Sequence, residues 1–346
     1  MNIFFKTFLK VFTILLSIVV FFAVLIGFLS FIESNTTKSQ FTFIKGDDSS
    51  ENKIAILKLQ GPIINDLLNI NNIAYFQIIN PEKVRKKLEN LKILQPKILI
   101  ISINSPGGTV AASYEIYEIV KKFKEENKIK IYFHTNETLA SGAYWLALAG
   151  DEIYASYGSL VGSIGVKGPD WIYFDKPISM SSGIFGKAIE TEYGIKVYSQ
   201  NAGKSKDLFN PFRQPTKEEL QNIQLLIDDI YDDFVNLVSK KRKIEINIIK
   251  SKIGALIYNS RHAKNNYLID GEINLNLLIN KIVEKNKFDK YQILESSNIN
   301  ASFFEKYFLQ IFSNQKLDKK IMINNLICKN LSINISSIIP NYLSSC

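Results

Sequence analysis

The chain opens on a long apolar segment. No charged residue occurs from Val11 to Ile32, and at 1.5 Å per residue a helix of that length would extend about 33 Å, enough to cross a bilayer. Lys6 and Lys10 precede the segment, so the positive-inside rule places residues 1–10 in the cytoplasm and the rest of the chain outside it. A cleaved signal peptide is the alternative. The apolar run is too long for one and lacks a small-x-small cleavage site, so a transmembrane anchor over residues 11–32 is expected.

The pattern after the anchor predicts an α/β domain. Residues 33–52 are polar and rich in Ser, Thr and Asn, as in a linker. Strands and helices then alternate, which predicts a parallel sheet with crossover helices. The expected strands are 53–59, 97–103, 129–133 and 151–155, and the expected helices are 81–91, 109–127 and 138–149.

A second helical region completes the expected domain. Thr216 and Glu219 have the spacing of a capping box at the start of a long helix. Helical and loop sequence continues to about Glu284, so the folded domain is expected over 53–284. Residues 285–346 are rich in Asn and Ser and form an appendage of unknown role.

Composition narrows the classes of function. The 346 residues carry a net charge of +9, but the basic residues are scattered instead of forming a dense patch interleaved with aromatics. No nucleic-acid partner is therefore expected, whereas a basic surface fits anionic lipid. Cys328 and Cys346 form no C-x-x-C pair, so neither a metal nor a redox cofactor is expected. Whether the two cysteines form a disulfide stays open.

The candidate chemistry centres on one serine. Ser141 lies in the run Leu139–Trp145 at an expected strand-to-helix turn, after the glycine pair Gly107-Gly108. A serine nucleophile needs a base within hydrogen-bond reach and donors for the oxyanion. Backbone N–H groups near Gly108 and Gly142 are candidate donors, because glycine allows a close approach of backbone to substrate.

The residue that would act as the base for Ser141 is less clearly marked in the sequence than the serine itself. The chain has two histidines, His134 and His262, and both are expected to be ordinary surface or helix-edge residues. Lysine is the alternative base, provided that an apolar pocket keeps it neutral. Lys206 lies in Gly203–Asp207, and the nearby Lys204 is the obvious alternative to it.

Five motifs resemble those of the signal peptide peptidase A (protease IV) family. In chain order they are INSPGG at 103–108, ASG at 140–142, GDEIYA at 150–155, VGSIGV at 161–166 and GKSKD at 203–207. The resemblance covers about residues 53–284 and implies a ClpP/crotonase-like α/β fold of repeated ββα units. It also implies Ser141 as nucleophile, Lys206 as general base, the Gly108 N–H as oxyanion donor and Ser163 as the residue that orients the lysine.

The resemblance carries expectations about setting and substrate. The family implies a single-pass serine endopeptidase of the inner membrane, with its catalytic domain on the periplasmic side, that cuts remnant signal peptides or other membrane-associated peptides. The chain holds one copy of the catalytic unit, like the family's short form. That form implies a homo-oligomer in which neighbouring subunits supply the serine and the lysine.

Two departures from the family pattern stand out. Ala143 replaces the second glycine after the nucleophile, a mild change on a helix. The stretch from Val166 to Lys206 is longer than in short-form members and holds Trp171, Tyr173 and Phe174. These aromatic residues are expected to pack; a rim over the site and a membrane-facing patch are the alternatives.

Other readings of the same fold compete with this one. A crotonase-type acyl-CoA enzyme has no use for Ser141, Lys206 or an anchor. A ClpP-like triad needs a histidine after the serine, and residues 142–261 contain none. A catalytically inactive membrane scaffold and a related envelope quality-control protease remain as alternatives.

Overall fold

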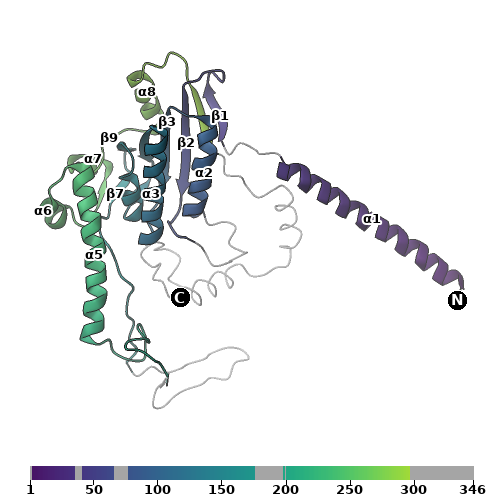
Figure 1. Ribbon diagram of the computed structural model, residues 1–346, viewed down its shortest axis with the longest axis horizontal. Coiled ribbons are helices and arrows are strands. Elements are labelled where there is room, and N and C mark those ends of the chain that lie inside the picture. The colour runs from purple at the N-terminus through teal and green to yellow at the C-terminus, as the bar shows by residue number, and fades with distance from the viewer. Residues whose placement is uncertain (1, 36–40, 66–76, 176–197, 199, 297–346) are drawn as a thin grey trace.

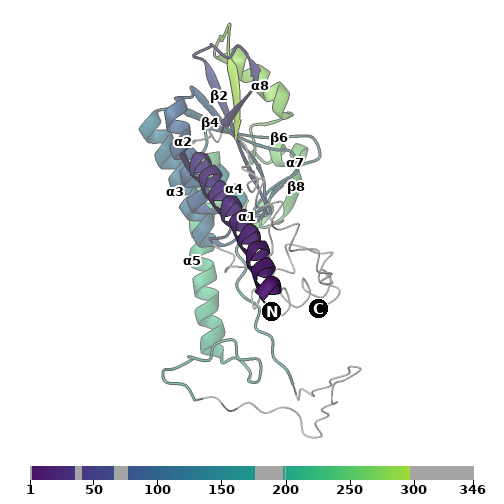
Figure 2. The ribbon, with the colours of Figure 1, turned by 90° about the vertical axis from the view of Figure 1, so that its right-hand side faces the viewer.

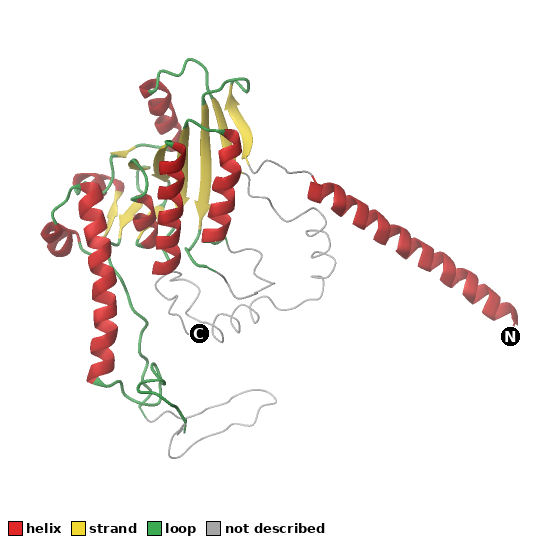
Figure 3. Cartoon of the chain, viewed as in Figure 1, coloured by secondary structure: helices red, strands yellow, loops and turns green. Residues whose placement is uncertain are grey.

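The computed structural model describes residues 2–35, 41–65, 77–175, 198 and 200–296. A mixed sheet with helices on both faces forms the body, and one long helix leads away from it (Figures 1 and 3). Cys328, Cys346 and the appendage beyond residue 296 lie outside the described residues.

The main sheet has seven described strands in the order β1-β10-β2-β3-β4-β6-β9. All neighbouring pairs are parallel except β1 with β10. The bounds are β1 Phe41–Gly46, β2 Lys53–Gln60, β3 Ile98–Asn104, β4 Lys130–Thr135, β6 Glu152–Ala155, β9 Gly271–Glu272 and β10 Gln292–Ser296. A smaller sheet has the order β5-β7-β8, with β5 Thr138–Ala140, β7 Leu160–Gly162 and β8 Ile257–Asn259.

Helices cover both faces of the main sheet. α2, α3, α4 and α5 lie on one side and α8 on the other (Figure 2). The bounds are α1 Asn2–Asn35, α2 Pro81–Leu94, α3 Val110–Asn127, α4 Gly142–Ala147, α5 Lys217–Arg242, α6 Ile246–Ile248, α7 Ser260–Asn265 and α8 Leu275–Lys285, with a π-helical turn η1 at Ile249–Ile253. The crossover helices predicted between parallel strands are confirmed.

The core follows the two faces of the sheet. Along β2, Ala55 and Leu57 face α2 and α3, while Ile54 and Ile56 face α8. Every apolar residue of β3 is buried, which explains why this strand reads as a continuous apolar run. On the larger side, Trp145 of α4 stacks on Phe234 of α5 with ring centroids 4.5 Å apart.

The sheet extends beyond the expected domain of residues 53–284. β1 falls in the expected linker, and β10 falls in the expected appendage, yet β10 lies between β1 and β2. The expected helix over 138–149 also divides, because residues 138–140 form β5 and the helix starts at Gly142. Both differences come from pairing with distant strands, which periodicity along the chain does not report. The capping box of Thr216 and Glu219 is present as predicted.

The helix α1 runs through the expected anchor range of residues 11–32. Among its described side chains, the stretch Ile3–Phe22 is long and apolar enough to cross a membrane, and none of it is buried against the body. Membrane anchors and signal sequences both meet this criterion of length and composition.

His134 is a buried histidine on β4. Its Nε2 lies 3.0 Å from the carbonyl oxygen of Ile273, so this nitrogen carries the proton and donates. Its Nδ1 is buried without a hydrogen-bond partner in the described part of the chain. Burial lowers the pKa of His134 below its usual value, since a charged imidazolium would lose its hydration there.

The contact between Trp145 and Phe234 is expected to anchor α5. Because Phe234 is 1% exposed, Phe234→Ala should lower the free energy of unfolding by about 3–5 kcal/mol through lost burial and the resulting cavity. Denaturant unfolding of the full chain in detergent, followed by tryptophan fluorescence, measures this loss. Leu225→Ala on the same helix is the control, because Leu225 is 62% exposed. Equal unfolding midpoints for the two variants would contradict the prediction.

His134 is expected to make stability depend on pH. Its folded-state pKa lies below the unfolded value of about 6.5, so the unfolded chain binds the proton more tightly. Stability should be constant above about pH 6.5 and fall as the pH decreases below that value. His134→Gln should flatten this dependence in thermal unfolding between about pH 7 and 5. A pH dependence that is as steep in His134→Gln as in the wild type would contradict the prediction.

Candidate active site

Ser141 occupies a strained turn between β5 and α4. Its φ of 53° and ψ of −125° lie in a region that residues with a side chain rarely adopt. Strain of this kind is stored where the surrounding structure fixes the backbone, often at functional sites. Here the Ser141 N–H donates to the carbonyl oxygen of Gly162 on β7 at 2.9 Å. The side chain is half-buried and does not cap its own helix.

The glycine loop after β3 packs directly on this turn. The Ser105 N–H donates to the Thr138 carbonyl at 2.8 Å, and the Ala140 N–H donates back to Ser105 at 3.2 Å. A Cβ atom on Gly107 would lie 2.7 Å from the Gly142 nitrogen and 2.9 Å from the Cβ of Ser141. Gly107 also has a φ of +98°, so both space and backbone conformation require glycine there.

Two backbone N–H groups beside Ser141 remain available. Those of Gly108 and Gly142 donate no hydrogen bond to any residue that the structure describes. They are close neighbours, because a Cβ on Gly142 would lie 3.4 Å from the Gly108 nitrogen. Paired backbone donors next to a serine are the arrangement that stabilises the oxyanion of acyl transfer.

Ser163 lies on the other side of the same turn. It follows Gly162, whose carbonyl accepts from Ser141, and its own N–H donates to Leu256 at 2.8 Å. Ser163 is half-buried and has a φ of 54°. The structure therefore brings together four predicted site residues: Ser141, Gly108, Gly142 and Ser163.

Lys206 lies in a turn that the start of α5 holds. Its side chain is exposed and forms no ion pair with the described residues. Lys204 is also exposed, but its Nζ pairs with Glu218 at 2.8 Å. The two lysines of the motif therefore differ, because only Lys204 has an ion-pair partner in the part of the chain that the structure describes.

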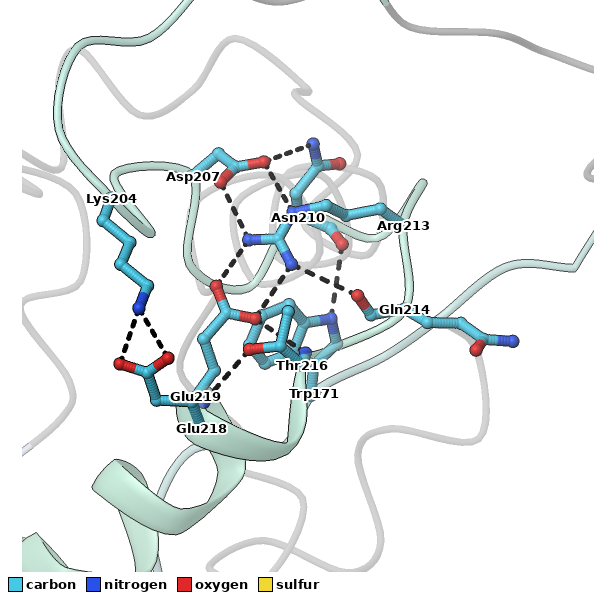
Figure 4. A network of polar contacts seen from close by, with 9 residues as sticks. All are labelled: Trp171, Lys204, Asp207, Asn210, Arg213, Gln214, Thr216, Glu218 and Glu219. Atoms are coloured by element: carbon cyan, nitrogen blue, oxygen red, sulfur yellow. Dashed lines mark hydrogen bonds and ion pairs between the residues drawn. The ribbon is translucent and has the colours of Figure 1, made fainter.

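An arginine ties this turn to α5 (Figure 4). Arg213 contacts the Asp207 carboxylate at 2.7 and 2.8 Å and the Glu219 carboxylate at 2.9 and 2.7 Å. It holds the pKa of Asp207 at about 2 and the pKa of Glu219 well below its usual range. The guanidinium also lies over the ring of Trp171, 5.3 Å from its centroid.

The aromatic residues of the long stretch partly pack on this network. Trp171 lies 5.2 Å from Phe209, and Phe174 lies 6.2 Å from Phe212, both between ring centroids. Tyr173 and Phe174 stay largely exposed, at 39% and 48%. Packing, as expected, is confirmed for Trp171.

The structure does not bring Lys206 to Ser141 within one chain. The helix α5 begins at Lys217, directly after its N-cap Thr216, and the 18 residues from Lys217 to Phe234 extend over about 27 Å. Phe234 packs on Trp145 of α4, whereas Thr216 adjoins the arginine network around Asp207. Figures 1 and 2 show this end of α5 projecting away from the sheet.

Neither histidine serves Ser141. His134 is bound to the backbone at Ile273, and His262 is exposed on α7. His262 is a surface residue as expected, whereas His134 differs from the expectation because it is buried on the central strand β4. Within the described ranges, no group of three His, Cys, Asp or Glu side chains could hold a metal ion.

Sequence reasoning missed two residues that shape the site. Ile63 pairs with Gly108, and a Cβ on Gly108 would lie 1.9 Å from the Ile63 carbonyl oxygen. Ser113 of α3 lies against Gly142, where a Cβ would be 2.2 Å from its Oγ. Both residues reach the site through tertiary packing, so no local pattern marks them.

Comparison with known proteins shows that the chain is similar to peptidases. A model of peptidase family S49 matches residues 123–289, and a model of Clp protease matches residues 60–153. A candidate signal peptide peptidase, SppA, of Enterococcus faecium is 31% identical over 185 residues, covering 54% of this chain and 49% of that protein. A candidate protease of Methanocaldococcus jannaschii is 34% identical over 174 residues, covering 50% and 51%.

A solved ClpP1 mutant from Listeria monocytogenes is 14% identical, covers 65% of this chain and 94% of that chain, and superposes with a TM-score of 0.40. The chain spans about half the length of the two curated relatives described above. The two family models together cover the glycine loop, the serine turn and the lysine motif. The chain therefore has an α/β fold like that of Clp protease, and over residues 123–289 it is similar to peptidase family S49, as its likeness to proteins named signal peptide peptidase SppA and protease 4 also indicates.

Proposed function

We propose that this peptidase is a membrane-anchored serine endopeptidase that uses a Ser-Lys dyad. The observation that carries the proposal is the strained turn at Ser141, beside which the N–H groups of Gly108 and Gly142 have no acceptor among the described residues. A structural role for this serine would not require a strained backbone or two nearby N–H donors. A nucleophile that attacks a bound carbonyl carbon requires donors of this kind for the oxyanion.

The proposed reaction is an acyl transfer to serine. Ser141 Oγ attacks the scissile carbonyl carbon while the neutral amine of Lys206 accepts its proton. The N–H groups of Gly108 and Gly142 hold the oxyanion of the tetrahedral intermediate. As that intermediate collapses, the lysine returns the proton to the leaving amine. Water then hydrolyses the acyl-enzyme by the same route, and Ser163 orients the lysine.

The lysine would come from a second copy of the chain. Lys206 is exposed and remote from Ser141 in one copy, whereas a lysine base needs a water-poor pocket to be neutral. Docking of the α5 start of one subunit against the serine turn of its neighbour would meet both needs. The active unit is then a homo-oligomer with shared sites.

The setting and substrates follow from α1 and from the relatives. The apolar helix would anchor the chain with its N-terminus in the cytoplasm and its catalytic domain on the periplasmic side of the inner membrane. Relatives named as signal peptide peptidase and protease 4 support remnant signal peptides, or other membrane-associated peptides, as substrates.

Labelling with a fluorophosphonate probe tests the dyad. Wild-type protein in detergent should be labelled, and both Ser141→Ala and Lys206→Ala should reduce labelling by at least about 100-fold, because one removes the nucleophile and the other its base. Lys204→Ala is the matched control, since Lys204 is paired with Glu218, and it should keep wild-type labelling.

Other outcomes of this experiment would revise the proposal. Labelling that survives Lys206→Ala but disappears in Lys204→Ala would move the base by two residues. A folded, assembled wild type that never reacts would indicate an inactive scaffold of the same fold.

Mixed oligomers test the shared site. When Ser141→Ala and Lys206→Ala chains are co-expressed in equal amounts, each alone inactive, about one quarter of the sites should combine an intact serine with an intact lysine. Peptidase activity of the purified mixture should reach about that fraction of wild type. Mixed oligomers without activity would place both residues of each site in one chain.

A further inference from the structure

Asn104, the last residue of β3, makes an unusual set of side-chain contacts. Its Oδ1 accepts hydrogen bonds from Thr135 Oγ1 at 2.9 Å, from the Asn136 N–H at 3.1 Å and from the Glu137 N–H at 3.0 Å. Backbone N–H groups only donate, so the oxygen of the amide must face this turn. One carbonyl oxygen therefore collects three donors from a single chain segment.

That segment leads to the nucleophile. The three donors lie at the end of β4 and in the turn before β5, and β5 ends where Ser141 begins its strained conformation. A hydrogen-bonded turn at this point sets the position and direction of the short strand. Thr138–Ala140 has only three residues, and this turn adds a constraint at its start to the pairing of the strand with β7 and Ser105.

The backbone on both sides of Asn104 completes the connection. Its carbonyl oxygen accepts from Gly61 at 3.0 Å, and the next residue, Ser105, pairs with both ends of β5. The Ser105 Oγ also accepts from the Gly107 N–H at 3.1 Å, which leaves the following Gly108 N–H as the unpaired one. Asn104 thus joins the loop that carries one oxyanion donor to the strand that carries the nucleophile.

We propose that Asn104 is a positioning residue of the active site, which sets the Gly108 N–H relative to Ser141 Oγ through its amide oxygen. This inference rests on the proposed role of Ser141 as nucleophile. Loss of the oxygen would leave the Thr135 hydroxyl and the Asn136 N–H without this acceptor. The Glu137 N–H would keep only its longer contact of 3.3 Å with Thr135 Oγ1, so the turn would be freed to shift. Displacements of about 1 Å in such a site are enough to reduce the rate about 100-fold.

The test compares two substitutions at the same position. Asn104→Ala removes the acceptor and should lower kcat on a chromogenic peptide substrate about 10- to 100-fold with little change in KM, because the oxyanion contact acts in the transition state. Asn104→Asp retains an oxygen acceptor for the three donors and should recover activity to within about threefold of wild type. Affinity for a peptide boronate, whose tetrahedral adduct occupies the oxyanion site, should follow kcat across the variants.

Asn274→Ala is the matched control for stability. Asn274 caps α8 by accepting from the Leu277 N–H at 2.9 Å, on the face of the sheet opposite the serine turn. This variant should lower the thermal midpoint through the lost cap and leave kcat and boronate affinity unchanged. It therefore separates a loss of stability from a loss of positioning.

Several outcomes would overturn the inference. They are wild-type kcat in Asn104→Ala, no recovery in Asn104→Asp, and an equal loss of kcat in Asn274→Ala. Failure of the proposed function is recognised separately, because wild-type protein would then neither react with a fluorophosphonate nor lose reactivity in Ser141→Ala. In that case the proposed positioning role of Asn104 would be wrong as well.

Discussion

The backbone pairing between Ser105 and β5 is the constraint on which the candidate site depends. Ser105 donates to Thr138 and accepts from Ala140, so the end of a buried central strand fixes the three residues before the nucleophile. The strained conformation of Ser141 is held from the other side by Gly162. A rigid sheet thereby supports a turn that would be unfavourable alone, and it does so within contact distance of Gly107 and Gly142.

The small residues around Ser141 follow from that constraint. The glycine loop, the serine turn and α3 approach so closely that a Cβ on Gly107, Gly108 or Gly142 would overlap its neighbours. Close approach brings two backbone N–H groups to one side of the serine without a partner among the described residues. The same packing that rules out side chains thus creates the donors that acyl transfer requires.

The long helix α5 separates the two halves of the proposed chemistry. Its C-terminal half packs on α4 through Phe234, whereas its start is held to the lysine turn by Arg213, Asp207 and Glu219. These contacts fix the lysine turn relative to the start of α5, because both carboxylates form paired contacts with one planar guanidinium. This separation within one chain is the observation that motivates the proposed site shared between subunits.

Local signals in the sequence agreed with much of the fold. The apolar run of β3, the helical spacing of α3 and the capping box of α5 each depend on neighbours in the chain, so each was predicted near its observed position. The strands β1 and β10 were missed, because the first lay in a polar stretch and the second pairs with residues more than 200 positions away. Neither pairing leaves a local pattern.

The sequence by itself determined which residues are candidates for the site: a serine at a strand-to-helix turn, glycines where backbone must approach, and a lysine in a recognisable motif. Only the tertiary structure decided which of these residues meet. Strand pairing brings Ser141, Gly108, Gly142 and Ser163 to one turn, because parallel strands end at the same edge of a sheet. The length and rigidity of α5 hold Lys206 away from them, since a helix fixes the distance between its ends.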